Sequence, residues 1–245
     1  MNEHFDDNAP IIITGGSQRL GLALAKTLHS AKTPVVITYR SKRDSIIELE
    51  SLGIVCKQVN FANNEELDSF SGYLTQNFSS IRAIIHNASD WLPESDALAP
   101  ADTMQQMLQV HVQAPYQLNL SVKPLLLNYH QQTIKAADII HLTDYIVDKG
   151  SKKHIAYAAS KAALANLTLS FSALLAPKVK VNSIAPSLLM FNESDDEAYK
   201  RKALKKSLMQ LAPGEIEGVE AVQYLLKSNF ITGSTLHLDG GRHLA

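Results

Sequence analysis

Residues 10–25 read PIIITGGSQRLGLALA, which is an apolar strand, a turn with two glycines and an apolar helix in succession. Glycines in such a turn let the backbone approach a pyrophosphate, and the N-terminus of the following helix supplies oriented N–H groups. The strict G-x-G-x-x-G spacing is absent, because Gly15 and Gly16 are followed by Arg19 and Gly21. The stretch therefore indicates a phosphate-binding turn, with a simple tight turn as the alternative.

The rest of the chain repeats this order of strand and helix. Apolar runs typical of strands occupy residues 10–14, 34–38, 53–59, 81–86, 137–143, 179–185 and 234–240. Helical patterns cover residues 19–31, 43–52, 64–78, 100–129, 152–175 and 216–228. The alternation predicts right-handed crossovers, and therefore an α/β fold with one Rossmann-type, doubly wound parallel sheet of about seven strands and helices on both faces.

We expect a single domain over residues 1–245, because the sequence contains no repeat, linker or low-complexity tract. Its least regular part is residues 187–215, directly after the sixth predicted strand. Ligands of such sheets bind at the carboxyl ends of the strands. The segment is therefore predicted to be a substrate lid, with a surface helical insertion as the alternative.

The composition favours a small-molecule partner. The chain has 23 basic and 24 acidic residues, a balance that argues against nucleic acid or an anionic membrane as the main partner. A lone cysteine, Cys56, cannot form an internal disulfide, and it leaves a metal site without the usual cysteine cluster, so no metal is predicted. We find neither a signal peptide nor an apolar run of about 18 residues, and we expect a cytoplasmic protein.

The end of the second predicted strand reads ITYRSKR, residues 37–43. An NAD site would carry an acidic residue there to bind the ribose hydroxyls, but none occurs between Gly21 and Asp44. Arg40 and Ser41 suit the extra phosphate of NADP instead, since a guanidinium binds phosphate through two parallel hydrogen bonds. The pattern indicates NADPH as cofactor, with a solvated basic turn as the alternative.

Tyr157 and Lys161 stand four residues apart on a predicted helix and so share one of its faces. A protonated lysine nearby favours the tyrosinate, which predicts a lowered pKa for Tyr157 and makes it a usable acid. The pair alone is a weak signal, because the chain contains eight tyrosines. Its position after the fifth predicted strand strengthens it.

Over essentially its full length, the chain resembles the short-chain dehydrogenase/reductase family. The matching motifs, in order, are TGGSQRLG (14–21), HNAS (86–89), YAASK (157–161), VNSIAP (181–186) and ITGSTLHLDGG (231–241). Three departures are informative: Arg19 replaces a family glycine, His111 stands where the family often has a catalytic asparagine, and Asp144 takes the place of the catalytic serine.

These departures, together with the NAS motif, resemble the pteridine reductases within that family. The resemblance implies NADPH-dependent reduction of a dihydropterin, with hydride delivered to C6. The substrate that it implies is 7,8-dihydromonapterin, converted to tetrahydromonapterin, with weaker action on dihydrofolate or dihydrobiopterin. A pterin offers ring nitrogens and an exocyclic amine, which a carboxylate can accept from or, if protonated, donate to.

The resemblance also assigns roles. Asp144 would hold the pterin and manage its proton with Tyr157, and Lys161 would hold the nicotinamide ribose and tune Tyr157. Trp91 would stack on the pterin, with a plain surface anchor as the alternative. The residues implied to bind substrate are Arg19, Ser89, Trp91, Asp144 and Tyr157. Those implied to bind NADPH are Gly15, Gln18, Arg19, Leu20, Gly21, Arg40, Ser41, Asn87, Ala88, Ser89, Tyr157, Lys161, Pro186 and Ser187.

His111 stays open between a role in ordering a proton-relay water and simple packing beside Pro115. Small residues fill the helix that carries Tyr157, and by resemblance this implies a homo-oligomer, either a dimer or a tetramer. Two other functions remain as alternatives. One is a carbonyl reductase of the same family, for example of 3-oxoacyl thioesters, which Asp144 disfavours. The other is a non-catalytic regulator that binds NADPH or a pterin, which the intact Tyr157 and Lys161 disfavour.

Overall fold

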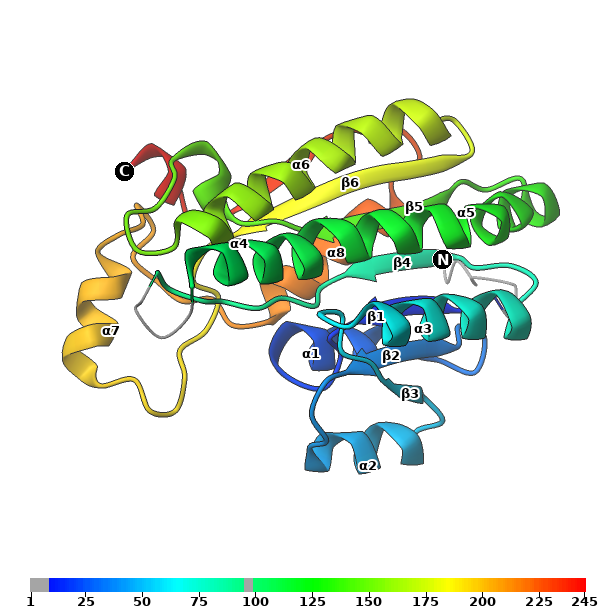
Figure 1. Cartoon of the computed structure of the whole chain (residues 1–245), viewed down its shortest axis with the longest axis horizontal. Helices are drawn as coiled ribbons and strands as arrows, with labels where there is room; N and C mark the ends of the chain where they lie inside the picture. Colours follow the sequence, from blue (N-terminus) through cyan, green and yellow to red (C-terminus); the bar gives the residue numbers. More distant parts are fainter. Residues whose placement is uncertain (1–8, 95–98) are drawn as a thin grey trace.

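The fold is a single seven-stranded parallel sheet with helices on both faces (Figure 1). The computed structural model describes residues 9–94 and 99–245. The strand order is β3-β2-β1-β4-β5-β6-β7, and every neighbouring pair is parallel. The strands are β1 (Ile11–Thr14), β2 (Val35–Tyr39), β3 (Val55–Gln58), β4 (Ala83–His86), β5 (Ala137–Leu142), β6 (Val179–Pro186) and β7 (Thr235–Leu238). The predicted doubly wound α/β fold is confirmed.

The helices lie close to their predicted positions, apart from α7, which lies in the segment 187–215 where no separate helix was predicted. They are α1 (Arg19–Leu28), α2 (Asp44–Ser51), α3 (Asn64–Asn77), α4 (Pro100–Leu108), α5 (Ala114–Thr133), α6 (Ile155–Leu175), α7 (Glu197–Leu204) and α8 (Ile216–Lys227). The predicted helical pattern over 100–129 is confirmed, with a π-helical turn, η1 (Gln109–Gln113), separating α4 from α5. Pro115 lacks the N–H that would bond to the carbonyl of His111, which explains why the regular ladder breaks there.

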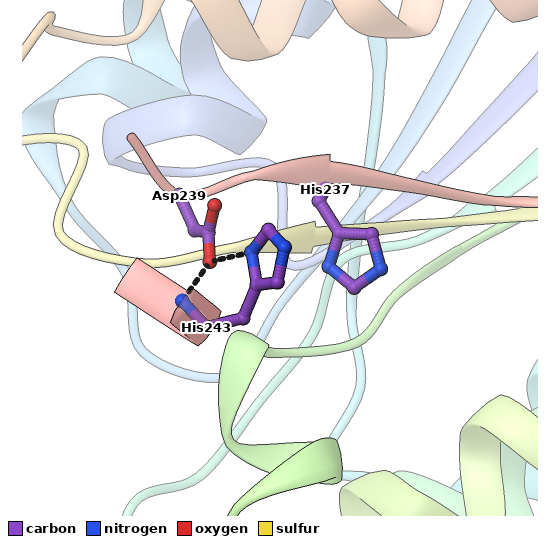
Figure 2. A group of neighbouring side chains, drawn as sticks. All are labelled: His237, Asp239 and His243. Atoms are coloured by element: carbon purple, nitrogen blue, oxygen red, sulfur yellow. Dashed lines mark hydrogen bonds and ion pairs between the residues drawn. The ribbon is translucent and has the colours of Figure 1, made fainter. Parts of the chain in front are cut away.

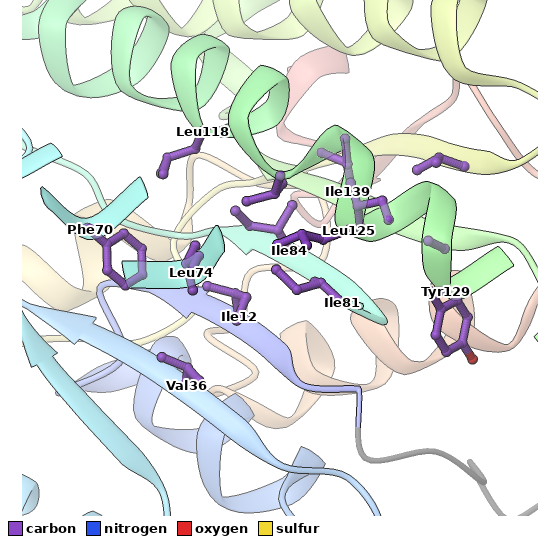
Figure 3. Close-up of a cluster of buried hydrophobic side chains, with 14 of the residues drawn as sticks. Ile12, Val36, Phe70, Leu74, Ile81, Ile84, Leu118, Leu125, Tyr129 and Ile139 are labelled. Carbon is purple, nitrogen blue, oxygen red and sulfur yellow. The ribbon is translucent and has the colours of Figure 1, made fainter. Parts of the chain in front are cut away.

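Alternating side chains of the strands build two cores, one on each face of the sheet. Ile12, Ile84 and Ile139 face α3 and α5, where Phe70, Leu74, Leu118 and Leu125 cover them (Figure 3). Their sequence neighbours Ile11, Ile13, Ile85 and Ile140 point to the opposite face and pack with α1, α2 and α8. Because both faces are covered, the strands are continuously apolar, as the sequence shows.

Helix α6 alone, among the helices of residues 9–94 and 99–245, has the length and apolar composition of a membrane span. The search for apolar runs in the sequence did not identify it. In this structure Leu164, Phe171 and Leu175 of α6 are buried, and the helix packs along β6. These contacts are those of a core helix.

The order in which successive strands are added to the sheet reverses at β1. Strands β2 and β3 lie on one side of β1, and β4 to β7 lie on the other. Because the strands are parallel, the carboxyl ends of β1, β4, β5 and β6 lie along one edge, and ligands of open α/β sheets bind at such an edge where the strand order reverses. The residues that follow these ends include Gly15, Asn87, Asp144 and Ser187. Four segments that are far apart in the sequence therefore meet at one edge.

A buried ion cluster lies at the opposite edge of the sheet, near the amino ends of β4, β5 and β6. Asp138 on β5 is fully buried and pairs with Arg82, just before β4, and with Lys180 on β6, whose Nζ lies 2.8 Å from the carboxylate. The parallel register aligns Asp138 directly with Lys180. Two buried cations thus depend on one carboxylate for compensation.

Replacing Asp138 with Asn should destabilise the fold strongly, because removing one member of a buried cluster leaves uncompensated buried charge and costs about 3–5 kcal/mol. Urea unfolding followed by circular dichroism would measure this change. The matched control is Glu48→Gln, which breaks the exposed pair with Lys26 and should cost only about 0–1 kcal/mol. Equal losses in the two variants would contradict the assignment of Asp138.

Candidate active site

The glycine turn between β1 and α1 is held tightly against the segment after β4. Gly15 has a φ of +69°, and a Cβ there would lie 2.8 Å from Cα of Ala88. A Cβ on Gly21 would lie 2.2 Å from the carbonyl oxygen of Gly15 and 2.6 Å from Nδ2 of Asn87. Neither position can accept a side chain without displacing the backbone.

The side chain of Asn87 stabilises this turn through hydrogen bonds. Its Nδ2 donates to the carbonyls of Thr14 and Gly15, at 3.1 and 2.8 Å. The hydroxyl of Thr14 in turn accepts from the backbone N–H groups of Asn87 and Ala88. Among the described residues no side chain caps α1, whose N-cap is Gln18. The first N–H groups of α1 therefore lack a side-chain acceptor, an arrangement that suits an anion.

Arg19 contacts the predicted lid. Its φ is +52°, which is unusual for a residue with a side chain. Its guanidinium donates to Oδ1 of Asn192 at 2.8 Å and to the carbonyl of Met190 at 2.9 Å. In this structure Arg19 therefore ties the glycine turn to residues 187–215, and its predicted contact with the cofactor phosphates remains a prediction.

A cavity of about 350 Å³ lies beside the glycine turn. Arg40 lies in its wall, and its Nη1 pairs with Oδ1 of Asp90 at 2.6 Å. Gln106 donates to the other oxygen of Asp90. Asp90 was not among the residues predicted from the sequence. The cavity is lined by Gly15, Ser17, Gln18, Arg19, Leu20, Gly21, Thr38, Tyr39, Arg40, Ser41, Arg43, Val59, Asn60, Phe61, Asn87, Ala88, Ser89, Asp90 and Val110.

Tyr157 and Asp144 form one hydrogen-bonded unit. The phenol of Tyr157, in the first turn of α6, donates to Oδ2 of Asp144 at 2.8 Å. The other carboxylate oxygen accepts from the backbone N–H of Ile146 and so caps the short helix η2 (Tyr145–Asp148). Lys161, one turn further along α6, donates to the carbonyl of Leu142 at 2.8 Å. The structure thus brings together the three residues predicted to be catalytic.

Burial dominates the ionisation of this group. It raises the pKa of the Asp144 carboxyl above its ordinary value, although hydrogen bonds from Ile146 and Tyr157 oppose the shift. Burial and the neighbouring Asp144 carboxylate raise the pKa of Tyr157 well above its ordinary value, with the Ser89 hydroxyl working in the opposite direction. Burial lowers the pKa of Lys161 to about 8. The predicted lowering of the Tyr157 pKa is therefore wrong for the protein without ligands.

His111 lies at the centre of a second hydrogen-bonded group behind Tyr157. The N–H of Asp90 donates to its Nε2, so the proton of the neutral ring must sit on Nδ1. Nδ1 then donates to the hydroxyl of Ser160, which donates to the carbonyl of Tyr157, at 2.8 and 2.7 Å. Ser89 lies 2.8 Å from Nε2. Burial lowers the pKa of His111 to about 2, so the ring stays neutral at ordinary pH.

The ring of His111 packs edge-on against that of Tyr157, with 5.4 Å between centroids. The group therefore fixes the position of Tyr157 from behind. This places His111 next to the tyrosine that was predicted to be catalytic and gives the His111 ring a definite tautomer. The sequence analysis did not identify Ser160, because its partner His111 lies 49 residues away.

Trp91 stands at the open side of the group. Its side chain is 66% exposed, although it contacts the rings of His154 and Tyr157, with centroids 4.7 and 6.4 Å away. Glu94 nearby accepts hydrogen bonds from the N–H groups of Ile155 and Ala156 and thereby caps α6. A large exposed aromatic ring beside Tyr157 is available for stacking.

Ser187 follows β6 at the same edge. Its N–H donates to the carbonyl of Leu238 and its hydroxyl to that of Asp239. Positive φ occurs at Arg19, Ile134 and Gln210 alone among the described non-glycine residues, so Ser187 keeps a φ that any residue tolerates. The backbone at this position therefore does not need the conformational freedom of a glycine.

The hydrogen bond between Tyr157 and Asp144 predicts how the phenol titrates. In Asp144→Asn, the pKa of Tyr157 should fall because the neighbouring negative charge is gone, but it should stay above its ordinary value because the burial remains. The measurement is the Cζ chemical shift of labelled tyrosine in the ligand-free protein, with Tyr157 assigned from Tyr157→Phe. Asp148→Asn, at an exposed carboxylate four residues away, is the control. An unchanged or higher titration midpoint in Asp144→Asn would contradict this account.

Comparison with known proteins agrees with this geometry. The family model described as short chain dehydrogenase matches residues 9–200. Proteins named dihydromonapterin reductase, from Escherichia coli (strain K12) and Shigella dysenteriae serotype 1 (strain Sd197), are each 50% identical over 235 residues. The alignments span 96% of this chain and 97% of each relative.

Solved structures show the same fold. The FolM alternative dihydrofolate reductase 1 from Brucella canis, complexed with NADP, superimposes with a TM-score of 0.84 at 25% identity. The match covers 97% of this chain and 95% of that one. Its counterpart from Brucella suis, also in complex with NADP, gives the same score and identity. From the family model, the full-length relatives and the fold, this chain belongs to the short-chain dehydrogenase/reductase family.

Proposed function

We propose that this protein is an NADPH-dependent dihydropterin reductase that converts 7,8-dihydromonapterin to 5,6,7,8-tetrahydromonapterin. The reaction adds a hydride to C6 and a proton to N5 of the C6–N5 double bond. The observation that carries the proposal is the hydrogen bond from Tyr157 to Asp144, because it puts a carboxylate beside the tyrosine of this family. Relatives named dihydromonapterin reductase, 50% identical over nearly their whole length, support the substrate.

The residues around the cavity fit NADPH. Gly15 and Gly21 leave the glycine turn free of side chains, and the N-terminus of α1 offers N–H groups to a pyrophosphate. Arg40 and Ser41 lie in the cavity wall after β2, where Arg40 now pairs with Asp90. When NADPH binds, Arg40 would bind the 2′-phosphate instead of the Asp90 carboxylate. NADPH supplies the hydride.

The protein's own groups then handle the proton and the ring. Tyr157, whose pKa lies well above its ordinary value, stays protonated at neutral pH, so the Tyr157–Asp144 unit keeps a proton beside the substrate. Asp144 offers its carboxylate to the N–H edge of the pterin. The buried Lys161, whose Nζ donates to the carbonyl of Leu142, would hold the nicotinamide ribose. Ser89 and Arg19 both line the cavity and complete the proposed contacts with the pterin.

A ketone reductase of the same fold needs a neutral hydroxyl to steady the carbonyl oxygen, and Asp144 replaces it with a carboxylate. We therefore rank reduction of 3-oxoacyl thioesters below reduction of dihydropterins. A non-catalytic regulator is the remaining alternative. The intact group of Tyr157, Lys161 and His111 weighs against it, because each of these side chains is held by hydrogen bonds in one position.

The test is NADPH oxidation by the purified protein, followed by absorbance with 7,8-dihydromonapterin, dihydrofolate and a 3-oxoacyl thioester offered in parallel. We expect the highest kcat/KM with dihydromonapterin and a weaker reaction with dihydrofolate. Turnover of the thioester alone would replace the proposal with carbonyl reduction. Binding of NADPH without turnover of any of the three would favour the regulator.

Trp91 provides a prediction about substrate binding. Because the ring is exposed beside Tyr157, Trp91→Ala should raise KM for the pterin while leaving KM for NADPH nearly unchanged. Loss of one aromatic stacking contact corresponds to about 0.5–1.5 kcal/mol, or roughly a 2- to 13-fold rise in KM. Trp91→Phe should retain most of the affinity. An unchanged KM for the pterin in Trp91→Ala would show that the ring only anchors its loop.

We also propose that the protein is a cytoplasmic homo-oligomer, a dimer or a tetramer. Tyr116 and Leu120 on α5 and Leu169 on α6 are exposed apolar side chains, which favours burial against another copy. Sedimentation equilibrium should report two or four times the mass of one chain. A monomer at micromolar concentration would contradict this.

A further inference from the structure

The C-terminal turn gathers two histidines and an aspartate outside the proposed active site. His237 lies on the edge strand β7, Asp239 follows that strand, and His243 lies in the last short helix, η3 (Arg242–Leu244). One nitrogen or oxygen atom from each lies within 4.8 Å of the others (Figure 2). The two imidazole rings lie 4.4 Å apart between centroids, at 31° to each other.

The backbone is built to bring these side chains together. Residues two apart on a strand share a face, so His237 and Asp239 project to the same side. Gly240 and Gly241, with φ of +59° and +75°, then turn the chain back. The N–H groups of Gly241 and His243 donate to the two carboxylate oxygens of Asp239, which is only 4% exposed. The turn therefore winds around this carboxylate.

The hydrogen bonds leave a ligand nitrogen available. Nδ1 of His243 lies 2.8 Å from Oδ2 of Asp239, to which it donates its proton. With Nδ1 protonated, Nε2 of the neutral ring carries the free lone pair. In Figure 2 this second nitrogen of His243 is turned toward the ring of His237. A histidine held by a carboxylate through one nitrogen, with the other free, is the usual arrangement of a metal ligand.

His237 is available as a second nitrogen ligand beside His243. Its side chain is exposed, and within residues 9–94 and 99–245 no hydrogen bond engages its ring. The guanidinium of Arg242 stacks on the ring of Tyr145, 4.3 Å from its centroid, and among the described residues it makes no hydrogen bond to either histidine. Zinc–nitrogen bonds are about 2.0–2.1 Å long, so binding one ion requires the exposed His237 ring to turn until its nitrogen and Nε2 of His243 both face that ion.

We propose that His237 and His243 bind a divalent transition-metal ion such as Zn²⁺, with Asp239 orienting His243 and supplying the negative charge. Water fills the remaining coordination positions. Imidazole nitrogens favour Zn²⁺, Co²⁺ and Ni²⁺, whereas Mg²⁺ and Ca²⁺ prefer oxygen ligands. This proposal does not rest on the reductase function or on NADPH.

An ion here would brace the C-terminal turn. The carbonyl of Gly240 accepts from the N–H of Met209 in residues 187–215, and Lys149, just after η2, donates to the carbonyls of Arg242 and Ala245. The turn thus connects the predicted lid with the short helix that Asp144 caps. Metal binding should stabilise these three segments together.

The experiment is titration of Co²⁺ into the untagged, ligand-free protein, followed by the visible absorption of the cobalt complex, with Zn²⁺ as competitor. We expect saturable binding of one Co²⁺ per chain, displacement by Zn²⁺, and no competition from Mg²⁺. His237→Ala and His243→Ala should each abolish it. Asp239→Asn should weaken it by about 10- to 100-fold, because an orienting carboxylate contributes that much to metal affinity. His130→Ala, at the far end of α5, is the matched control and should bind normally.

Hydrogen exchange supplies a second readout that does not depend on the spectrum. Zn²⁺ should slow amide exchange in residues 239–245 of the wild-type protein and leave His237→Ala unaffected. Binding that survives in both histidine variants would overturn the proposal, as would the absence of saturable Co²⁺ binding up to millimolar concentration. Circular dichroism of each variant establishes that it is folded.

Discussion

The hydrogen bond between the phenol of Tyr157 and the carboxylate of Asp144 is the interaction on which the proposed chemistry depends. It joins the first turn of α6 to the end of β5, thirteen residues earlier in the chain. It also sets the electrostatics of the site, since burial and this carboxylate together keep the phenol protonated. An ordinary member of the family has a serine at this point. A serine hydroxyl carries no negative charge and so cannot raise the pKa of the tyrosine in this way.

The remainder of the molecule holds that pair in place. The sheet brings the carboxyl ends of β1, β4, β5 and β6 to one edge. At that edge the side chain of Asn87 donates a hydrogen bond to the glycine turn. His111 sits in a π-helical turn, where its ring reaches Ser89 on one side and Ser160 on the other. Such turns are often found at functional sites because they redirect a side chain that a regular helix would point elsewhere. From this position His111 supports Tyr157 from behind.

Much of this could be predicted from the sequence, because it depends on local pattern. Apolar runs located all seven strands to within a few residues, and the order of motifs placed Gly15, Asn87, Asp144 and Tyr157 at one edge. What could not be predicted depends on tertiary packing. Asp90 meets Arg40 across 50 residues, and Arg19 meets Asn192 across 173. The direction of the pKa shift of Tyr157 was predicted wrongly for a related reason. The sequence shows that Lys161 is near Tyr157, but it does not show how deeply both side chains are buried.

The break at η1 could have been anticipated in part, since Pro115 lacks an N–H and so interrupts the ladder of a helix drawn through it. That the break takes the form of a π-turn, and that it presents His111 to Ser160, follows from the packing of α4 and α5 beside α6. The pairing of His237 with His243 likewise becomes visible only when Gly240 and Gly241 turn the chain back.

The most direct measurement of the central claim is kcat/KM for dihydromonapterin in Asp144→Asn, which keeps the oxygen that caps η2 and removes the charge. The account predicts a fall of about 100-fold or more, the range expected for a group that manages a proton in the transition state, while the Kd for NADPH stays unchanged. Asp148→Asn should behave as wild type. Normal turnover in Asp144→Asn would contradict the account.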